Sequence, residues 1–195
     1  MASPQLGRRP STTKTQISEL AIALFTDRGF DETSVDEIAQ AAGIARRTLF
    51  RYYPSKNAIP WGDFDDHLSA MRDHLAGLPP DASVADALRS ALIAFNEVSE
   101  DQVAAHRRRM TLLLTVPALQ AHSMLMYTGW RAVIAEYVAA RTGGAAEDHL
   151  PQTVGWLMLG VALSSYEQWL ADPSTNLTTL LADGSRILGS GLEAL

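Results

Sequence analysis

The sequence contains no cysteine among its 195 residues. This absence excludes disulfide bonds, cysteine-ligated zinc, iron–sulfur clusters and thiol nucleophiles, and it fits a cytoplasmic protein. No segment approaches the roughly 18 apolar residues that a membrane-spanning helix requires, so no membrane partner is expected. The first ten residues carry two arginines without a hydrophobic segment behind them, and we expect no signal peptide there.

Catalytic and metal-binding motifs are also missing. The sequence has no His-Glu-x-x-His, no Glu-x-x-His pair, no phosphate-binding glycine loop and no Gly-x-Ser-x-Gly. Asp63 and His67 are spaced for one face of a helix, with Asp66 and His74 nearby, but a solvent-exposed face explains them better than a metal. We therefore expect no catalytic residue, no metal and no cofactor. An α-helical small-molecule-binding protein, or an enzyme of unidentified chemistry, is the alternative to the function developed below.

Positive charge is scarce and unevenly placed. The whole chain has 16 basic and 22 acidic residues, a net charge of −6. Residues 1–60 hold 8 basic and 6 acidic groups, a net charge of +2, whereas the remainder holds 8 and 16, a net charge of −8. This asymmetry is typical of a module that faces nucleic acid and is attached to a body with a different partner.

The N-terminal part has the periodicity of short helices. The first predicted helix has apolar residues on one face: Ile17, Leu20, Ala21, Leu24 and Phe25. Gly29 stands where a left-handed C-terminal cap is expected. A second helix follows, because either Thr33 with Asp36 or Ser34 with Glu37 has the spacing of a capping box.

The next segment predicts a helix-turn-helix. Gly43 interrupts the second helix and can adopt the positive φ of a tight turn, and a third helix then runs to Tyr53, before Pro54. Four of its polar side chains point outward: Arg46, Arg47, Thr48 and Arg51. Arginine suits guanine edges and phosphates, so this helix is a candidate for reading DNA.

The runs Thr33–Ala39 and Ala42–Lys56 closely resemble the DNA-binding domain of TetR-type transcriptional regulators. The resemblance implies an all-α protein with two domains. Residues 1–56 would form a three-helix helix-turn-helix domain, with residues 1–10 as a flexible basic arm. Residues 57–195 would form a helical domain for ligand binding and dimerisation.

Because they project from the start of the third helix, Arg46, Arg47 and Thr48 are expected to contact bases. The resemblance implies phosphate contacts from Tyr52, Tyr53 and Lys56. Phosphate contacts are also expected from Arg51 and, through backbone N–H groups at a helix N-terminus, from Thr33 or Ser34. The family often has tyrosine where this chain has Phe50, so that hydroxyl contact is absent and Tyr52 is its substitute. Tyr53 stands where the family has a buried phenylalanine, so either a phosphate contact or a core position is open for it.

The resemblance extends to one subgroup, the regulators of mycofactocin systems. The segments that carry it are Arg51–Asn57 with Trp61–Phe64, His106–Met110, Val116–Ser123 and Tyr166–Pro173. Because they lie along the body as well as the DNA-binding part, the resemblance covers most of the chain.

The body is predicted to be helical, over residues 55–77, 83–100, 102–115, 117–142, 147–171 and 175–192. The last two helices have more apolar surface than one monomer covers, and in the family they form a dimeric four-helix bundle. We therefore expect a homodimer; a larger monomer core is the alternative. Its interface is expected to contain Val154, Leu157, Val161, Leu177, Leu181 and Leu188.

The middle helices are rich in methionine and aromatic residues, which in this family line a cavity for an inducer. The expected lining is Phe95, His106, Arg109, Met110, Leu113, Gln120, Met124, Tyr127, Trp130 and Trp156. For each residue singly, ordinary core packing is the alternative. Arg107–Arg109 face either an anionic ligand head or solvent. A long-chain acyl-CoA, with its apolar tail and phosphates, fits both features.

Together these features predict a regulator that responds to a ligand. The homodimer would bind a palindromic operator in double-stranded DNA and would release it when the ligand is bound. Repression is the commoner mode in the family.

Overall fold

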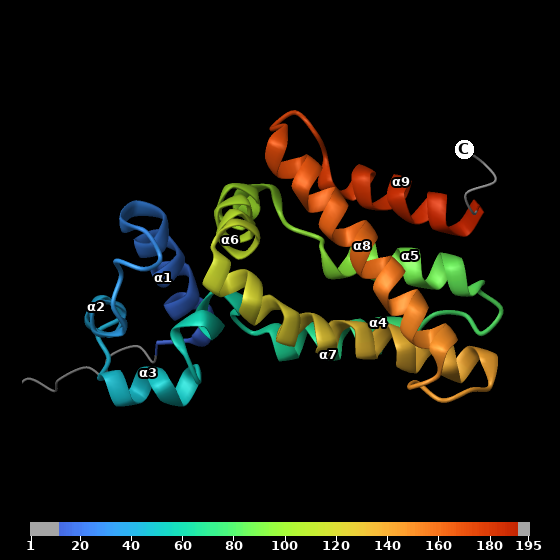
Figure 1. The fold of residues 1–195 in the computed structure, drawn as a ribbon, viewed down its shortest axis with the longest axis horizontal. Coiled ribbons are helices and arrows are strands. Elements are labelled where there is room, and N and C mark those ends of the chain that lie inside the picture. The colour runs from blue at the N-terminus through green and yellow to red at the C-terminus, as the bar shows by residue number, and fades with distance from the viewer. Residues whose placement is uncertain (1–11, 191–195) are drawn as a thin grey trace, which may run out of the picture. The chain divides into compact units, whose positions relative to one another are not determined.

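The computed structural model describes residues 12–190, and every regular element in that range is a helix (Figure 1). The predicted all-α fold class is confirmed. The expected basic arm, residues 1–10, lies outside the described residues. The chain divides after Gly62 into two compact units. Our expected border was residue 56; the first unit extends to Gly62 because the 3-10 helix η1 (Lys56–Trp61) packs on helix α1 (Lys14–Arg28).

Helix α1 carries the core of the first unit. It begins with a capping box in which the Thr13 side chain accepts the Gln16 N–H and the Gln16 side chain accepts the Thr13 N–H. Its face of Ile17, Ala21 and Phe25 is buried. This face is the one that the apolar spacing predicts.

The helix-turn-helix is formed by α2 (Val35–Ala41) and α3 (Arg46–Tyr52). Ser34, not Thr33, is the N-cap of α2. The turn places Gly43 at φ +66°, as predicted. Ile38 and Leu49 are fully buried, so the two short helices are held by one shared core.

The second unit contains six longer helices: α4 (Phe64–Ala76), α5 (Val84–Phe95), α6 (Val103–Thr115), α7 (Pro117–Thr142), α8 (His149–Ala171) and α9 (Leu177–Ser190). A short 3-10 helix, η2 (Glu100–Gln102), precedes α6. Helix α8 packs between α7 and α9, α5 packs against α9 and α4, and α6 contacts both α7 and α8 (Figure 1). Helices α6 and α8 are in contact, and Asn96, the residue that caps the C-terminal end of α5, is hydrogen-bonded to Tyr166 of α8.

The prediction of one helix over residues 55–77 is wrong. The chain forms η1, which contains Pro60, and then breaks at Gly62 before α4 begins. Gly62 has φ +59° and ψ −130°, a conformation that residues with a side chain rarely adopt.

Among the helices of residues 12–190, none combines the length and the apolar character that crossing a membrane requires.

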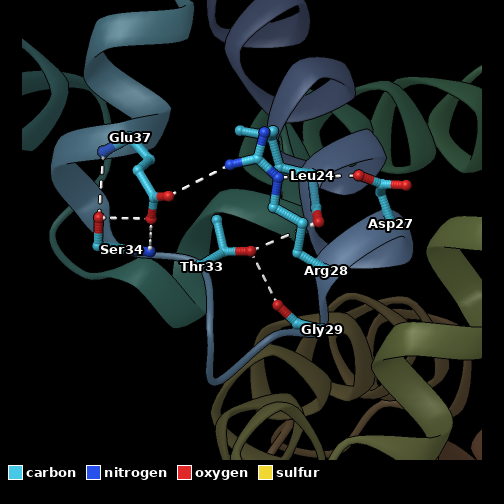
Figure 2. A network of polar contacts seen from close by, with 7 residues as sticks. All are labelled: Leu24, Asp27, Arg28, Gly29, Thr33, Ser34 and Glu37. Atoms are coloured by element: carbon cyan, nitrogen blue, oxygen red, sulfur yellow. Dashed lines mark hydrogen bonds and ion pairs between the residues drawn. The ribbon is translucent and has the colours of Figure 1, made fainter.

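Thr33 ties α1 to α2 from a fully buried position. Its hydroxyl donates to the carbonyl oxygen of Gly29 at 2.8 Å and lies 3.4 Å from that of Leu24 (Figure 2). We expect Thr33→Val, which keeps the shape but removes the donor, to lower the free energy of unfolding by about 1–2 kcal/mol. Urea denaturation measures this. The control Thr26→Val removes a hydroxyl of an exposed residue that donates only within α1, to the Ile22 carbonyl, and should stay within about 0.5 kcal/mol of wild type. Equal effects of the two variants would contradict the prediction.

Candidate DNA interface and ligand site

Helix α3 presents a charged face on a fixed core. Arg46, Arg47 and Arg51 are exposed, and Thr48 is half-buried. Leu49 is buried on the opposite side, where it meets the core of the unit. The expected base-contacting residues therefore lie together at the start of α3.

Arg46 has an intramolecular partner. Its Nη1 lies 2.8 Å from Oδ2 of Asp36 on α2, and its guanidinium lies 5.6 Å from the ring centroid of Phe50. Both members of the ion pair are exposed, and exposed pairs of this kind contribute only about 0–1 kcal/mol. Arg46 can therefore exchange Asp36 for an acceptor on DNA at small cost.

At the start of α2, both residues expected to contact phosphate have intramolecular partners. The Thr33 side chain is buried on Gly29. The Ser34 N–H and hydroxyl both donate to the Glu37 carboxylate, at 2.8 and 2.7 Å (Figure 2). Hydrogen bonds from Ser34 lower the pKa of Glu37, and Arg28 adds to the effect. A negative charge thus sits where the phosphate was expected.

Tyr53, the next expected phosphate contact, lies in the core. It is only 3% exposed, and its hydroxyl donates to the Lys14 carbonyl at 2.8 Å. Of the two alternatives for Tyr53, the core position is the one observed. Tyr52 is half-buried and donates its hydroxyl to the Thr12 carbonyl at 3.0 Å, with the Arg51 guanidinium 5.9 Å from its ring centroid.

Lys56 is held beside an aromatic pair. Its Nζ lies 4.3 Å from the ring centroid of Phe30 and 5.8 Å from that of Phe25. Partial burial lowers the pKa of Lys56, and the nearby carboxylates of Asp31 and Glu32 oppose that shift. The ammonium group is therefore fixed in position at the edge of the unit.

The interior of the second unit contains a directed chain of hydrogen bonds. Tyr166 on α8 donates its only hydroxyl proton to Asn96 Oδ1 at 2.7 Å, and Asn96 Nδ2 donates to the Leu92 carbonyl at 2.7 Å. His106 Nε2 on α6 lies 2.8 Å from the same Tyr166 oxygen. Because that oxygen has already given its proton to Asn96, His106 must be the donor, so its proton sits on Nε2. The chain joins α6, α8 and the end of α5.

This cluster is kept neutral by burial. Burial lowers the pKa of His106 to about 4, with smaller contributions from the charges of Arg109 and His67. Burial also raises the pKa of Tyr166 and of Tyr127. Arg109 lies close enough to influence both His106 and Tyr166, so one positive charge borders a neutral hydrogen-bonded group.

The structure brings together part of the expected ligand lining. Met110, Leu113 and Trp130 are buried, and the rings of Phe95 and Trp130 lie 6.2 Å apart in an edge-to-face arrangement. His106 contacts Tyr166, and Arg109 and Tyr127 lie near enough to influence the pKa of Tyr166. Tyr166 and Asn96 were missed; Tyr166 stood in a segment that carried the resemblance, but nothing in the spacing pointed to Asn96.

Three expected lining residues are elsewhere. Gln120 and Met124 are exposed on α7. Trp156 is 49% exposed on α8, and the Arg131 guanidinium stacks on it at 3.7 Å from the ring centroid. The periodicity was ambiguous because α8 is apolar around most of its circumference. An open groove on this unit runs along α4 and α7 and contains none of the expected lining residues.

The three consecutive arginines have separate environments. Arg107 stacks on Trp169 at 4.0 Å from the ring centroid and donates to the Trp169 carbonyl, so it stabilises the C-terminal end of α8. Arg108 is exposed. Arg109 is the one whose charge reaches the His106 cluster.

Two expected interface residues are also buried within the monomer. Leu177 is almost fully buried and Leu181 is 1% exposed, because α9 packs on α8 and α5. Val154, Val161 and Leu188 are half-buried and Leu157 is exposed. The large apolar side chains that are exposed on α8 and α9 are Leu150, Trp156, Leu157 and Ile187.

In the part of the chain that the structure describes, no group of three or more histidine and acidic side chains is arranged for a metal ion. His67 Nδ1 faces the backbone carbonyl of Asp63 at 2.9 Å, not its carboxylate.

The position of His106 predicts a pH dependence of stability. In the unfolded chain His106 takes up a proton near the ordinary histidine pKa of about 6.5, whereas in the folded protein its pKa is lowered to about 4. Stability from neutral His106 is therefore present above pH 6.5 and is lost as the pH falls to 4, by about 3 kcal/mol. Urea denaturation between pH 7 and 4 should show a shallower fall for His106→Gln than for wild type. His149→Gln, at an exposed histidine, is the control; parallel curves for wild type and His106→Gln would refute the prediction.

Each of the two units matches a known protein-family model. Residues 17–59 match the model of bacterial regulatory proteins of the tetR family, and residues 82–193 match the MftR C-terminal domain. The chain is 55% identical to the Mycobacterium tuberculosis protein named as the mycofactocin biosynthesis transcriptional regulator MftR, over 98% of this chain and 96% of that protein.

Solved structures agree in fold. FadR of Thermus thermophilus, a TetR-family repressor crystallised with lauroyl-CoA, is 25% identical with a TM-score of 0.60, covering 92% of this chain and 94% of FadR. FadR of Bacillus subtilis, in complex with stearoyl-CoA, is 16% identical with a TM-score of 0.64, covering 91% and 98%. These relatives are named as transcription regulators, and this chain belongs to the TetR family, with a body of the MftR C-terminal type.

Proposed function

We propose that this regulator binds a palindromic operator as a homodimer and releases it when a ligand occupies the body. The observation that carries the proposal is α3, a seven-residue helix whose buried Leu49 leaves the arginine face outward. In this proposal, Arg46, Arg47 and Thr48 contact bases. Arg51 and Lys56 contact phosphates, and the Tyr52 ring supports Arg51.

Self-association follows from the exposed apolar side chains of α8 and α9. Leu150, Trp156 and Leu157 on α8 and Ile187 on α9 are each more than 40% exposed. A second copy that covers them satisfies the twofold symmetry of a palindrome. Such a dimer presents its recognition helices about 34–36 Å apart, one turn of DNA.

The ligand is proposed to be a long-chain acyl-CoA. Buried Met110 and Leu113 of α6 and the ring pair of Phe95 and Trp130 suit an acyl chain, and Arg109, whose charge reaches His106, suits an anionic head. FadR of Thermus thermophilus, which shares this fold, was crystallised with lauroyl-CoA. In this proposal, the bound ligand displaces α6 relative to α8. The displacement favours a state of the dimer in which the two α3 helices no longer match the spacing of the operator half-sites.

Operator recognition is tested with the DNA upstream of the protein's own gene. Arg47→Ala should weaken binding by about 1–3 kcal/mol and relax the preference at one position, whereas Lys56→Ala should weaken binding to all sequences alike. Fluorescence anisotropy at several salt concentrations measures both effects, because lost phosphate contacts reduce the salt dependence. Arg108→Ala, at an exposed arginine of the body, is the matched control. A wild-type protein without sequence preference would refute the proposal and leave a small-molecule-binding protein.

Ligand binding is tested by thermal unfolding with lauroyl-CoA, stearoyl-CoA and free coenzyme A. At a ligand concentration of 100 times Kd, binding adds about 2.7 kcal/mol to the stability of the folded state, so the Tm should rise. Arg109→Gln should lose most of the shift, and its neighbour Arg108→Gln should keep it. No shift at saturating acyl-CoA, or an equal shift with coenzyme A alone, would count against the acyl-chain site.

A further inference from the structure

Phe50 is an exposed aromatic residue in an unusual place. It is 41% exposed, and among the described residues of the first unit no other large apolar side chain is so accessible. A single exposed apolar residue on an ordinary surface needs no explanation. Phe50, however, lies on the recognition helix α3, and its immediate surroundings are cationic.

The ring occupies the middle of the charged face. In a helix, residues three and four positions apart are neighbours, so Phe50 lies beside both Arg47 and Arg46. The Arg46 guanidinium is 5.6 Å from the ring centroid, and Asp36 binds the same guanidinium at 2.8 Å. Leu49, the adjacent residue, points into the core. Any DNA that the arginines contact therefore also covers the ring.

The chemistry of the ring limits what it can contact favourably. Phenylalanine has no donor or acceptor, so it cannot read the hydrogen-bonding edge of a base, and it gains nothing from a phosphate. Each base pair shows donors and acceptors in the major groove, but thymine also carries an apolar C5-methyl group there. Covering that methyl group with the ring removes apolar surface of both partners from water.

We propose that Phe50 is a specificity-determining residue that contacts the 5-methyl group of a thymine in each half-site. This inference rests on the proposed operator binding. The family often has a tyrosine at this position, whose hydroxyl contacts DNA; in this chain, the inference gives Phe50 an apolar contact instead.

The test removes the methyl group and leaves base pairing intact. The DNA upstream of the protein's own gene is amplified either with thymidine or with deoxyuridine triphosphate, and binding is measured by anisotropy. Wild type should bind the uracil duplex about fourfold more weakly for each methyl contacted, the value expected for one buried carbon. Phe50→Ala should bind the thymine duplex more weakly than wild type does and should bind both duplexes equally.

Two variants separate this contact from general effects. Lys56→Ala should weaken binding to both duplexes and keep the wild-type ratio of their Kd values, because a phosphate contact does not depend on the thymine methyl group. Phe50→Leu should keep part of the ratio. A wild-type ratio of one, or an unchanged ratio in Phe50→Ala, overturns the inference while sequence-specific binding stands. If the wild-type protein shows no sequence preference at all, the proposed operator binding is wrong, and the inference about Phe50 is wrong as well.

Discussion

A helix of seven residues is too short to persist in water by itself, so α3 depends on the packing beneath it. Leu49 supplies the buried contact within the helix, and Tyr53 fixes its C-terminal end through the hydrogen bond to Lys14. This one-sided anchoring leaves the opposite face outward, where Arg46, Arg47 and Phe50 lie. The DNA chemistry proposed for the protein thus follows from a packing constraint in a small core, although the chain as a whole has a net charge of −6.

The body has a comparable constraint, a buried polar group that must keep its hydrogen bonds. His106, Tyr166 and Asn96 form a chain with a single direction, and their partners come from three different helices. Removing one member leaves another unsatisfied in the interior, at a cost of about 1–3 kcal/mol. In the proposed function, a ligand that enters beside Arg109 would replace or extend these bonds. The contact of α6 and α8 with Asn96 at the end of α5 would then couple ligand binding to the arrangement of the helices.

Short local signals in the sequence predicted the first unit well, because its helices depend on capping residues, a turn glycine and one apolar stripe. The signals were weaker where two residues offered the same cap: Ser34, not Thr33, begins α2. In the body, the helices were predicted, but which of their side chains are buried and which are exposed was not. Helix α8 is apolar on most sides, so Trp156 was assigned to the interior although it is exposed. Leu181 was assigned to the interface, although the packing of α9 on α8 and α5 buries it within the monomer. Asn96 had no sequence signal, since its role depends on contacts with distant residues.

The central claim is that ligand and operator favour different states of one protein, which requires their binding to be coupled reciprocally. The direct measurement is a closed cycle: the Kd for operator DNA with and without saturating acyl-CoA, and the Kd for acyl-CoA with and without saturating operator. The account predicts that each partner weakens the other, and by the same factor. If acyl-CoA binds tightly yet leaves the operator Kd unchanged, the body and the DNA-binding unit are not coupled through this ligand, and the account is wrong.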